Sequence, residues 1–486
     1  MLPPISPQQQ EAALLVKPND SLVIDSKRIV KGDEVSYFHL IENAESALRW
    51  RLAMFDSAQS SIDMQTFMWE DDRVGALLFD RVLRAAERGV KVRVLIDDVW
   101  LKSNEALLAS YERSPNISIR LYNPSRVRSP AIGRGLYFLT HYSSMNHRLH
   151  SKVLIADGVW SLSGGRNVGD KYFGLSDKYN FRDLDVLSTG GVVSEMRQEF
   201  DLFWNSAYVY PARYLQPKVD ASELAESTRE IRRLIQDDAE LKHLPPYPFL
   251  WDKQAAGLRS KMVPGKAIFI ADVPGGRDRV MEEYLSKHLY KAANEVVIVT
   301  PYFIPYKASF EELEEVITRG VRVKIVVPSL GANNHLITHS HYRKYRKKLL
   351  SLGCEIYEYR HDPDEKQRAL SNSSSVVAPY VCLHKKAIIA DRRYCYIGSL
   401  NMDPRALNIN AESGLIIDSE PLAQKLAQQV EEMTQPRNAW RVVLDEKKEV
   451  RWLGESGRVL QIQPSRTKMQ RFWDAWARWI PIESEL

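Results

Sequence analysis

Residues 150–157 read HSKVLIAD and residues 384–391 read HKKAIIAD. In both stretches a histidine, a lysine and an aspartate occupy positions 1, 3 and 8, with apolar residues before the aspartate. An asparagine follows each histidine by 17 residues, at the end of GGRN (164–167) and of GSLN (398–401). A single His-x-Lys on a strand is usually a solvated face, but two copies with the same spacing indicate a duplicated functional unit.

The sequence around these stretches repeats at an offset of about 230 residues. Each copy reads as a strand, a helix that ends at an Arg-Gly pair, a second strand and a third strand. The matching runs are 75–89 with 310–320 for the helix, 90–97 with 321–327 for the second strand, and 118–124 with 354–360 for the third. Strands that alternate with helices predict an α/β fold of two homologous domains, each a mixed β-sheet flanked by helices.

The repeat divides the 486-residue chain into five parts, and this length suits two or three folded units. The segment between the two copies is charged and then proline-containing, so we interpret it as a helix with a connecting loop. The predicted parts are an N-terminal segment (1–39), a first domain (40–215), a linker (216–264), a second domain (265–435) and a C-terminal tail (436–486).

The composition is that of a globular protein, with 27% charged and 44% hydrophobic residues. There are 67 Lys and Arg against 62 Asp and Glu, and a net charge of +5 is far from the concentrated basicity of a nucleic-acid-binding protein. No apolar run is long enough for a transmembrane helix, and residues 1–16 lack the pattern of a signal peptide. Three cysteines without CxxC spacing argue against a disulfide framework and a thiolate metal site; they are Cys354, Cys382 and Cys395.

Two histidines, two lysines and two asparagines that meet between the domains would suit a phosphodiester. Cations and amides hold the non-bridging oxygens, one imidazole attacks phosphorus, and the other protonates the leaving oxygen. The sequence therefore predicts an active site at the domain interface made of His150, Lys152, Asn167, His384, Lys386 and Asn401.

A nucleophilic imidazole needs an acceptor for its other N–H group. Glu412 lies 28 residues after His384, and Asp183 lies 33 residues after His150, with Asp185 as the competitor in the first half. We expect Asp183 and Glu412 to be the partners, each of the histidine in its own half. Two further carboxylates follow apolar residues and are expected to anchor turns or pair with a buried arginine; they are Asp157 and Asp391.

The doubled HxKxxxxD pattern with its Gly-x-x-Asn elements resembles the phospholipase D superfamily over residues 40–435. That resemblance implies two phospholipase D-like domains and a phosphohistidine intermediate formed without metal or cofactor. Several longer stretches are similar to the bacterial cardiolipin synthases of the C type: QTFMWEDD at 65–72, ERGVKVRVLIDD at 87–98, GGRNVGDKYF at 164–173, TPYFIP at 300–305 and YRKKLLSLGCEIYEY at 345–359.

Within that family the N-terminal histidine is usually the nucleophile, which would make His150 attack and His384 act as acid and then base. The symmetry of the two motifs leaves this order open. The resemblance also implies a phosphate contact from the Ser399 hydroxyl, which the first half lacks because Gly165 takes that place.

The resemblance implies a phosphatidyltransferase that makes cardiolipin from phosphatidylglycerol with a second phosphatidylglycerol or with phosphatidylethanolamine. The expected partners are phospholipids and a membrane surface rather than nucleic acid, and an accessory protein stays open. A phospholipase D hydrolase that forms phosphatidic acid is the nearest alternative, because the pocket and not the motif selects the acceptor. A superfamily nuclease and a non-catalytic lipid-binding module are further alternatives; intact motifs disfavour the module.

We expect peripheral attachment to the bacterial inner membrane without a transmembrane helix. The stretch 465–483 combines an aromatic stripe with arginines and a lysine, which is typical of an interfacial helix on anionic lipid. Docking of that stripe onto the domain is an equal alternative. Two other segments are basic. We expect 125–140 at the mouth of the site and 339–348 near anionic head groups, although 339–348 also fits a solvated helix face.

Overall fold

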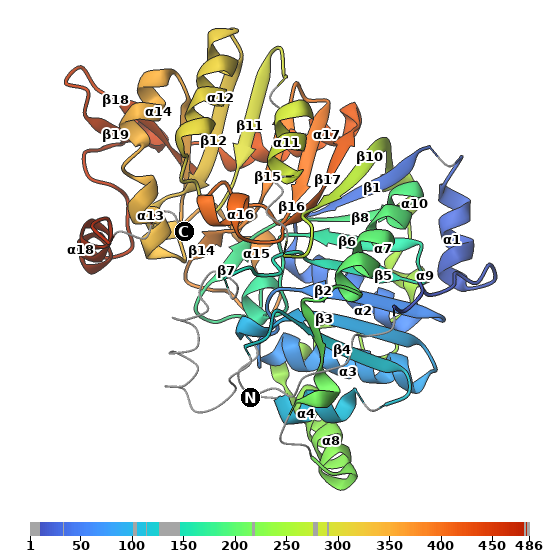
Figure 1. Ribbon diagram of the computed structural model, residues 1–486. Helices are drawn as coiled ribbons and strands as arrows, with labels where there is room; N and C mark the ends of the chain where they lie inside the picture. Colours follow the sequence, from blue (N-terminus) through green and yellow to red (C-terminus); the bar gives the residue numbers. More distant parts are fainter. Residues whose placement is uncertain are drawn as a thin grey trace.

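The computed structural model describes residues 10–32, 34–100, 105–112, 114–125, 146–215, 219–275, 280–288, 291–480 and 483. Two β-sheets of the same topology are joined edge to edge, with helices on both faces (Figure 1). The predicted segment 125–140 lies almost wholly outside the described residues, with only Ser125 inside them.

The first sheet has the strand order β9-β4-β3-β2-β5-β6-β8-β1. Only the pairs β2–β3 and β3–β4 are parallel, as crossover helices require, and the remaining pairs are antiparallel. The strands are β1 (Ser36–Ile41), β2 (Ser61–Thr66), β3 (Lys91–Asp97), β4 (Ile117–Tyr122), β5 (Val153–Ala156), β6 (Trp160–Gly164), β8 (Asp185–Thr189) and β9 (Val209–Pro211).

The second sheet repeats this arrangement in the order β10-β17-β16-β15-β11-β12-β13-β18, again with two parallel pairs. The strands are β10 (Val263–Ala271), β11 (Glu295–Val299), β12 (Arg322–Pro328), β13 (Glu355–Tyr359), β15 (Ala387–Ala390), β16 (Tyr394–Gly398), β17 (Ser413–Asp418), β18 (Ala439–Leu444), β19 (Val450–Leu453) and β20 (Val459–Leu460). The expected mixed α/β fold with two homologous domains is confirmed.

The two domains share one extended sheet because β1 pairs antiparallel with β10, with Phe38 opposite Val263. A hydrophobic cluster spans this junction, and it includes Val153 and Val186 of the first domain and Leu415 and Leu422 of the second. Each domain has a further core on its outer side, between its sheet and its helices. The relative position of the domains is therefore fixed by a backbone ladder and by a buried apolar contact.

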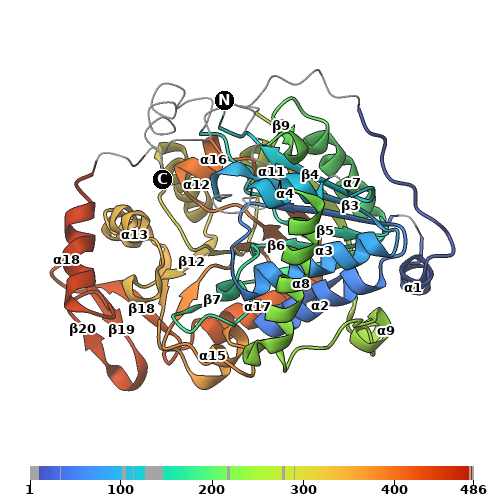
Figure 2. The same ribbon diagram turned by 90° about the horizontal axis from the view of Figure 1, so that it is seen from below.

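Helices cover the outer faces of the first domain, and Figure 2 shows α2, α3 and α8 lying side by side. The α-helices up to the junction are α1 (Ser21–Ile29), α2 (Ala44–Ser57), α3 (Arg73–Glu87), α4 (Glu105–Tyr111), α7 (Gly191–Trp204), α8 (Ala221–Asp237), α9 (Trp251–Gln254) and α10 (Leu258–Lys261). The predicted linker thus contains α8, which packs against α3 and α4 of the first domain.

After the junction the structure describes eight α-helices, the last of them in the C-terminal tail. Six 3₁₀ turns lie in the described part of the chain. The helices are α11 (Val280–His288), α12 (Lys307–Thr318), α13 (Leu336–Tyr342), α14 (Arg346–Leu352), α15 (Glu365–Ser371), α16 (Pro404–Asn408), α17 (Glu420–Met433) and α18 (Lys468–Ala477). The 3₁₀ turns are η1 (Asp98–Trp100), η2 (Asp170–Tyr172), η3 (Ala212–Tyr214), η4 (Ala239–Leu241), η5 (Leu330–Ala332) and η6 (Glu455–Gly457).

The Arg-Gly pairs of the repeat end the crossover helices as expected. After α3 and α12 the chain turns through Gly89 at φ +91° and Gly320 at φ +85°, a region that favours glycine. The stretch assigned to a C-terminal tail begins inside the fold, because β18 adds to the second sheet beside β13. No helix in the described ranges combines the length and the apolar character that crossing a bilayer requires.

Candidate active site

Short parallel ladders between the domains bring the two histidine motifs together. The strand β14 (Val381–Leu383), just before His384, pairs with β7 (Asn180–Arg182) of the first domain. The matching contact in the other half is a parallel bridge between Leu149 and Ala411. Each histidine segment is therefore held by the domain to which it does not belong.

The histidines and lysines themselves lie just before the strands, which begin at Val153 and Ala387. The expectation that they sit on the strands is wrong by a few residues. The reason is that their backbone bonds cross the interface: the amide of His150 donates to the Ala411 carbonyl at 2.9 Å, and that of His384 donates to the Arg182 carbonyl at 2.9 Å.

Each histidine ring is oriented by a carboxylate of the opposite domain. The Nδ1 atom of His150 lies 2.8 Å from Oε2 of Glu412, and the Nδ1 atom of His384 lies 2.6 Å from Oδ2 of Asp183. The expectation that each histidine pairs within its own half is wrong, although both carboxylates are histidine partners. The parallel ladders explain this crossed pairing, because each of them ends with a histidine beside a carboxylate from the other domain.

The sheet register shows which of Asp183 and Asp185 corresponds to Glu412. Gly164 stands opposite Asp185 in the first sheet, and Gly398 stands opposite Gly414 in the second. Asp183, two residues earlier, thus corresponds to Glu412. Asp185 instead contacts two arginines, Arg51 at 2.8 Å and Arg166 at 3.2 Å.

The Gly165 and Ser399 positions meet the two carboxylates in different ways. The Ser399 hydroxyl donates to Oε2 of Glu412 at 2.5 Å. A Cβ atom built on Gly165 would come within 2.2 Å of Oδ1 of Asp183, so a side chain there would displace the carboxylate. Ser399 therefore holds the histidine partner in this structure.

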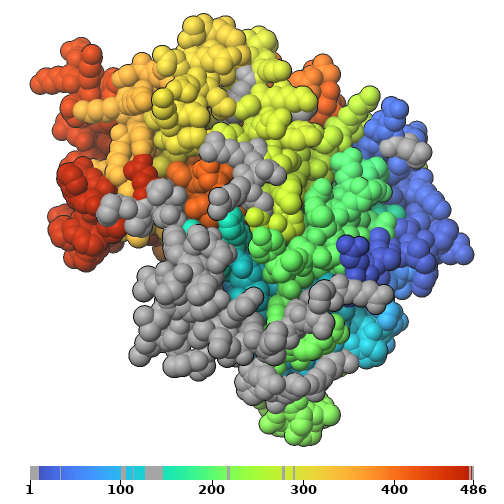
Figure 3. Space-filling view, viewed as in Figure 1, coloured from blue at the N-terminus to red at the C-terminus, as the bar shows by residue number. Residues whose placement is uncertain are grey.

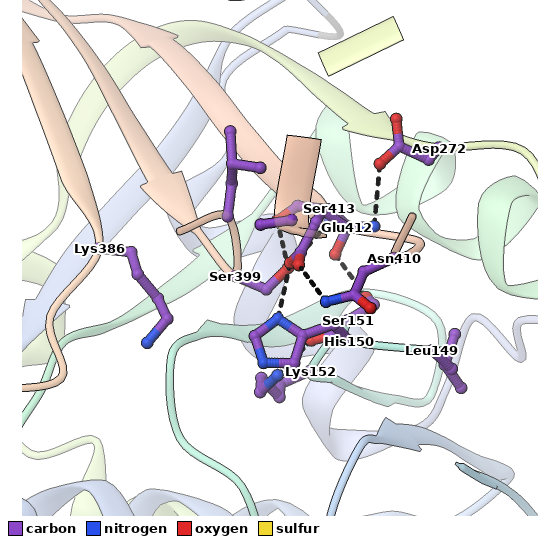
Figure 4. A network of polar contacts seen from close by, with 12 residues as sticks. Leu149, His150, Ser151, Lys152, Asp272, Lys386, Ser399, Asn410, Glu412 and Ser413 are labelled. Carbon is purple, nitrogen blue, oxygen red and sulfur yellow. Dashed lines mark hydrogen bonds and ion pairs between the residues drawn. The ribbon is translucent and has the colours of Figure 1, made fainter. Parts of the chain in front are cut away.

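Figure 4 shows His150 directed at Glu412, with Asn410 beside the carboxylate and Asp272 beside the Glu412 backbone N–H group. The Asn410 amide donates to Oε1 of Glu412 at 3.3 Å, and the Glu412 backbone N–H donates to Asp272 at 3.0 Å. Sequence reasoning missed both residues. Asn410 stands two positions before Glu412 and could have been found by asking what binds the carboxylate, whereas Asp272 follows β10 and carries no local signal.

Both histidines are neutral in the substrate-free site. Burial, then the charges of Lys152 and Lys386, hold the pKa of His150 well below its usual value. Burial and the charge of Lys386 lower the pKa of His384 to about 3, against the opposite effect of Asp183. The lysine of each motif also lowers the pKa of the histidine in the other motif, so the two motifs are electrostatically coupled.

The two carboxylates have opposite pKa shifts. Burial raises the pKa of Glu412 to about 7, although Lys152 and Ser399 oppose it. Burial acts on Asp183 in the same direction, but His384, Lys386 and Arg166 outweigh it and hold its pKa below the usual range. Asp183 is thus ionised at neutral pH, while Glu412 is poised to titrate there.

The lysines are buried beside the histidines that precede them. Lys152 Nζ donates to the His150 carbonyl, and Lys386 Nζ donates to the His384 carbonyl at 2.7 Å and lies 3.1 Å from both nitrogens of that ring. Burial is the main cause of the depressed pKa of both lysines, and it brings that of Lys386 to about 8. An anion bound between the two lysines would raise the pKa of both and favour their charged form.

The two asparagines are placed differently. Asn167 donates to the Tyr172 hydroxyl at 2.8 Å and accepts from the Met68 backbone N–H at 3.3 Å. Asn401 is buried, and its Oδ1 atom has no hydrogen-bond partner among the described residues. The amide of Asn167 is thus held from both sides, whereas the carbonyl oxygen of Asn401 is not.

The aspartate of each motif anchors the start of a neighbouring strand. The carboxylate of Asp157 accepts the backbone N–H groups of 59–61 at the start of β2, and that of Asp391 accepts those of 293–295 at the start of β11. Both aspartates adopt a positive φ, 47° and 49°. Neither one contacts the histidines.

Within the described ranges, no group of three or more His, Cys, Asp or Glu side chains gathers as metal ligands would. The three cysteines are free and buried.

Comparison with known proteins identifies relatives over most of the chain. Residues 52–204 and 285–434 both match the family described as "Cardiolipin synthase, PLD-like domain". The chain is 31% identical over 452 residues to cardiolipin synthase C of Escherichia coli strain K12, covering 90% of this chain and 93% of that protein. It is 25% identical over 417 residues to a cardiolipin synthase of Oceanobacillus iheyensis, covering 83% of this chain and 71% of the relative.

Among solved structures, the phosphatidylserine synthase of Haemophilus influenzae Rd KW20 superposes with a TM-score of 0.60. The superposition covers 95% of this chain and all of that one, at 17% sequence identity. This likeness concerns the fold.

Proposed function

The chain belongs to the cardiolipin synthase family of phospholipase D-like proteins, and on that premise we propose that it makes cardiolipin from phospholipids through a phosphohistidine intermediate. The observation that carries the proposal is the crossed pairing of two buried histidines with Glu412 and Asp183. Each carboxylate accepts the Nδ1–H group, which leaves Nε2 for chemistry on phosphorus.

In the first step the Nε2 atom of His150 attacks the phosphorus of a phosphatidyl donor. A P–N bond forms while the bond from phosphorus to the head-group oxygen breaks, and His384 gives that oxygen its proton. The negative phosphodiester raises the pKa of His384 on binding, so this ring carries a proton in the complex. The head group leaves as glycerol from phosphatidylglycerol or as ethanolamine from phosphatidylethanolamine.

In the second step a glycerol hydroxyl of another phosphatidylglycerol takes the place of the head group. His384, now neutral, removes the hydroxyl proton as the oxygen bonds to phosphorus and the P–N bond breaks. The products are cardiolipin and the original enzyme. The ionised Asp183 supports the proton-carrying state of His384 in both steps.

The charges around the phosphate explain why attack is favourable there. Lys152 and Lys386 are buried and face the growing charge on the non-bridging oxygens in a site of low dielectric. Asn167 and Asn401 are assigned to the same oxygens by their positions after each motif. Glu412 offsets the positive charge that His150 gains when its nitrogen bonds to phosphorus.

Both substrates are lipids, so the proposal places the enzyme at the surface of the bacterial inner membrane as a peripheral protein. The experiment that tests the function is product analysis with the purified chain. Phosphatidylglycerol vesicles, alone or with phosphatidylethanolamine, should yield cardiolipin together with free glycerol or ethanolamine.

Phosphatidic acid as the sole product would instead identify a hydrolase. The variants His150→Ala and His384→Ala should form no cardiolipin while keeping the melting temperature of the parent, and turnover by either one would refute the mechanism. Leu234→Ala, at an exposed position of α8, is the matched control and should be fully active.

A further inference from the structure

The C-terminal helix α18 turns its aromatic side chains away from the protein. Seven of the seventeen large hydrophobic residues that are exposed in the described part of the chain lie within residues 459–479. Five of them share one side of α18 and its end: Met469 (61% exposed), Phe472 (60%), Trp473 (47%), Trp476 (56%) and Trp479 (75%). Such a concentration marks a contact surface rather than scattered exposure.

The helix is attached to the domain by its polar side. Asp474 is buried and accepts hydrogen bonds from His339, Arg343 and Gln463 at 2.6–2.7 Å. Gln470, one turn earlier, donates to the Leu330 carbonyl at 2.7 Å. The alternative that the aromatic stripe docks onto the domain is therefore wrong, because buried polar partners already occupy the docking side.

A third side of α18 forms one wall of a cationic cleft. Arg471, Ala475 and Arg478 line it, four and three residues apart, so they share a helix face next to the aromatic one. The cleft has a volume of about 530 Å³ and is lined by seven basic side chains against one acidic side chain, Glu449. The basic residues are Arg343, Lys344, Arg346, Lys347, Arg451, Arg471 and Arg478.

Most of these cations already have carboxylate partners, such as Glu358 for Arg346 and Asp445 for Arg451. The two on α18 differ. Within the part of the chain that the structure describes, no carboxylate lies within ion-pair distance of Arg471 or Arg478. Arg471 donates to the Ser465 hydroxyl at 2.7 Å, and Arg478 lies over the Trp479 ring at 4.8 Å.

The same contacts correct the expectation of a solvated basic face at 339–348. His339, His341 and Arg346 are buried and bound to carboxylates. Arg343, Lys344 and Lys347 line the cleft together with Arg346. This segment thus serves as the platform of α18 and as the opposite wall of the cleft.

From this arrangement we infer that α18 and the cationic cleft dock the protein onto an anionic phospholipid bilayer. This docking surface is distant in sequence from the two motif histidines. The aromatic side lies in the interfacial layer, where Trp and Phe are favoured, while the cleft beside it receives lipid phosphates. In both ribbon views α18 lies at the outer edge of the molecule, and Figure 3 shows the C-terminal region exposed there. The choice of a lipid surface as the partner rests on the proposed function.

The test is vesicle flotation of the full-length protein, with phosphatidylcholine vesicles that contain or lack phosphatidylglycerol. Trp473→Ala with Trp476→Ala should lower the partition coefficient about ten-fold or more, because alanine keeps the helix and removes interfacial apolar area. Arg471→Ala and Arg478→Ala should each weaken binding about five-fold, and only to the anionic vesicles. Leu234→Ala on α8 should bind as the parent does.

Variants of α18 that float as well as the parent would overturn the inference, as would a parent protein that fails to float. Millimolar inorganic phosphate that abolishes vesicle binding, while the aromatic variants bind as the parent does, would indicate that the cleft binds a free anion. This result would also overturn the inference. Binding is measured apart from chemistry: His384→Ala should float normally. Absence of cardiolipin with intact flotation would therefore refute the proposed function and leave the docking surface standing.

Discussion

The Nδ1 atom of His384 lies 2.6 Å from Oδ2 of Asp183, which stands 201 residues earlier in the chain and in the other domain. His150 and Glu412 form the reciprocal pair across 262 residues. Since His150 and His384 each take their orientation from the opposite domain, the β1–β10 junction that fixes the domains also fixes the tautomers of both rings.

The identity of the nucleophile can be read from a trapped adduct. In His384→Ala, a phosphatidyl donor with a p-nitrophenol leaving group needs no acid, so His150 should be phosphatidylated and then accumulate, because the base for the second step is missing. Mass spectrometry of the digested protein should locate the adduct on His150. An adduct on His384 in His150→Ala would reverse the assignment.

The rate should fall on the acid side near neutrality. As the pH drops through about 7, the Glu412 carboxyl takes up a proton and can donate it to Nδ1 of His150, which forces the ring proton onto Nε2 and removes the attacking lone pair. Asp183 stays ionised throughout because its pKa is depressed. A plot of kcat/KM against pH should show this acid limb. The residual activity of Glu412→Gln should lack the limb, because an amide accepts the Nδ1–H bond without titrating.

Ser399→Ala should shift that limb to higher pH. The serine hydroxyl donates to Glu412 at 2.5 Å and lowers the carboxyl's pKa, so its removal favours the protonated acid. Loss of a hydrogen bond to a charged group should also reduce kcat/KM about ten-fold at neutral pH. Ser163→Ala is the matched control, because that buried hydroxyl has no partner in the described structure. An unshifted limb in Ser399→Ala would contradict the assignment.

Asp391→Asn should weaken the fold rather than the chemistry. The carboxylate accepts three backbone N–H bonds at 2.7–3.0 Å, and asparagine tolerates the positive φ of 49°. Loss of the charge should lower the free energy of unfolding by about 1–3 kcal/mol in urea titrations, with the activity of the folded fraction retained. Asp418→Asn, which breaks an exposed pair with Arg393, should cost less than about 1 kcal/mol.

The internal repeat was sufficient to predict the architecture. Arg-Gly pairs at 88–89 and 319–320 and the β-branched runs after them are local features, and local backbone preferences alone place a helix end and a strand there. Asp183 lies seven positions before Gly190 at the predicted strand end, as Glu412 lies seven positions before Ser419, and this spacing favours Asp183 over Asp185. The sheet register places Asp183 where Glu412 stands in the other half.

The histidine pairing could not be predicted in the same way. Both carboxylates follow a histidine at a similar distance in sequence, and only the parallel ladders between the domains decide which ring each one meets. The aromatic stripe of α18 presents the same difficulty. Its periodicity is visible in the sequence, but the side that faces the protein depends on His339 and Gln463, which lie elsewhere in the chain.

The crossed pairing also has a consequence for biosynthesis. A ribosome that has completed the first domain has made His150 but not Glu412, so the emerging histidine has no carboxylate to select its tautomer. The reactive ring is assembled only after the second domain has been translated and has joined the shared sheet. Under the proposed mechanism, truncated and half-made chains would therefore lack an oriented nucleophile and should not attack phospholipids.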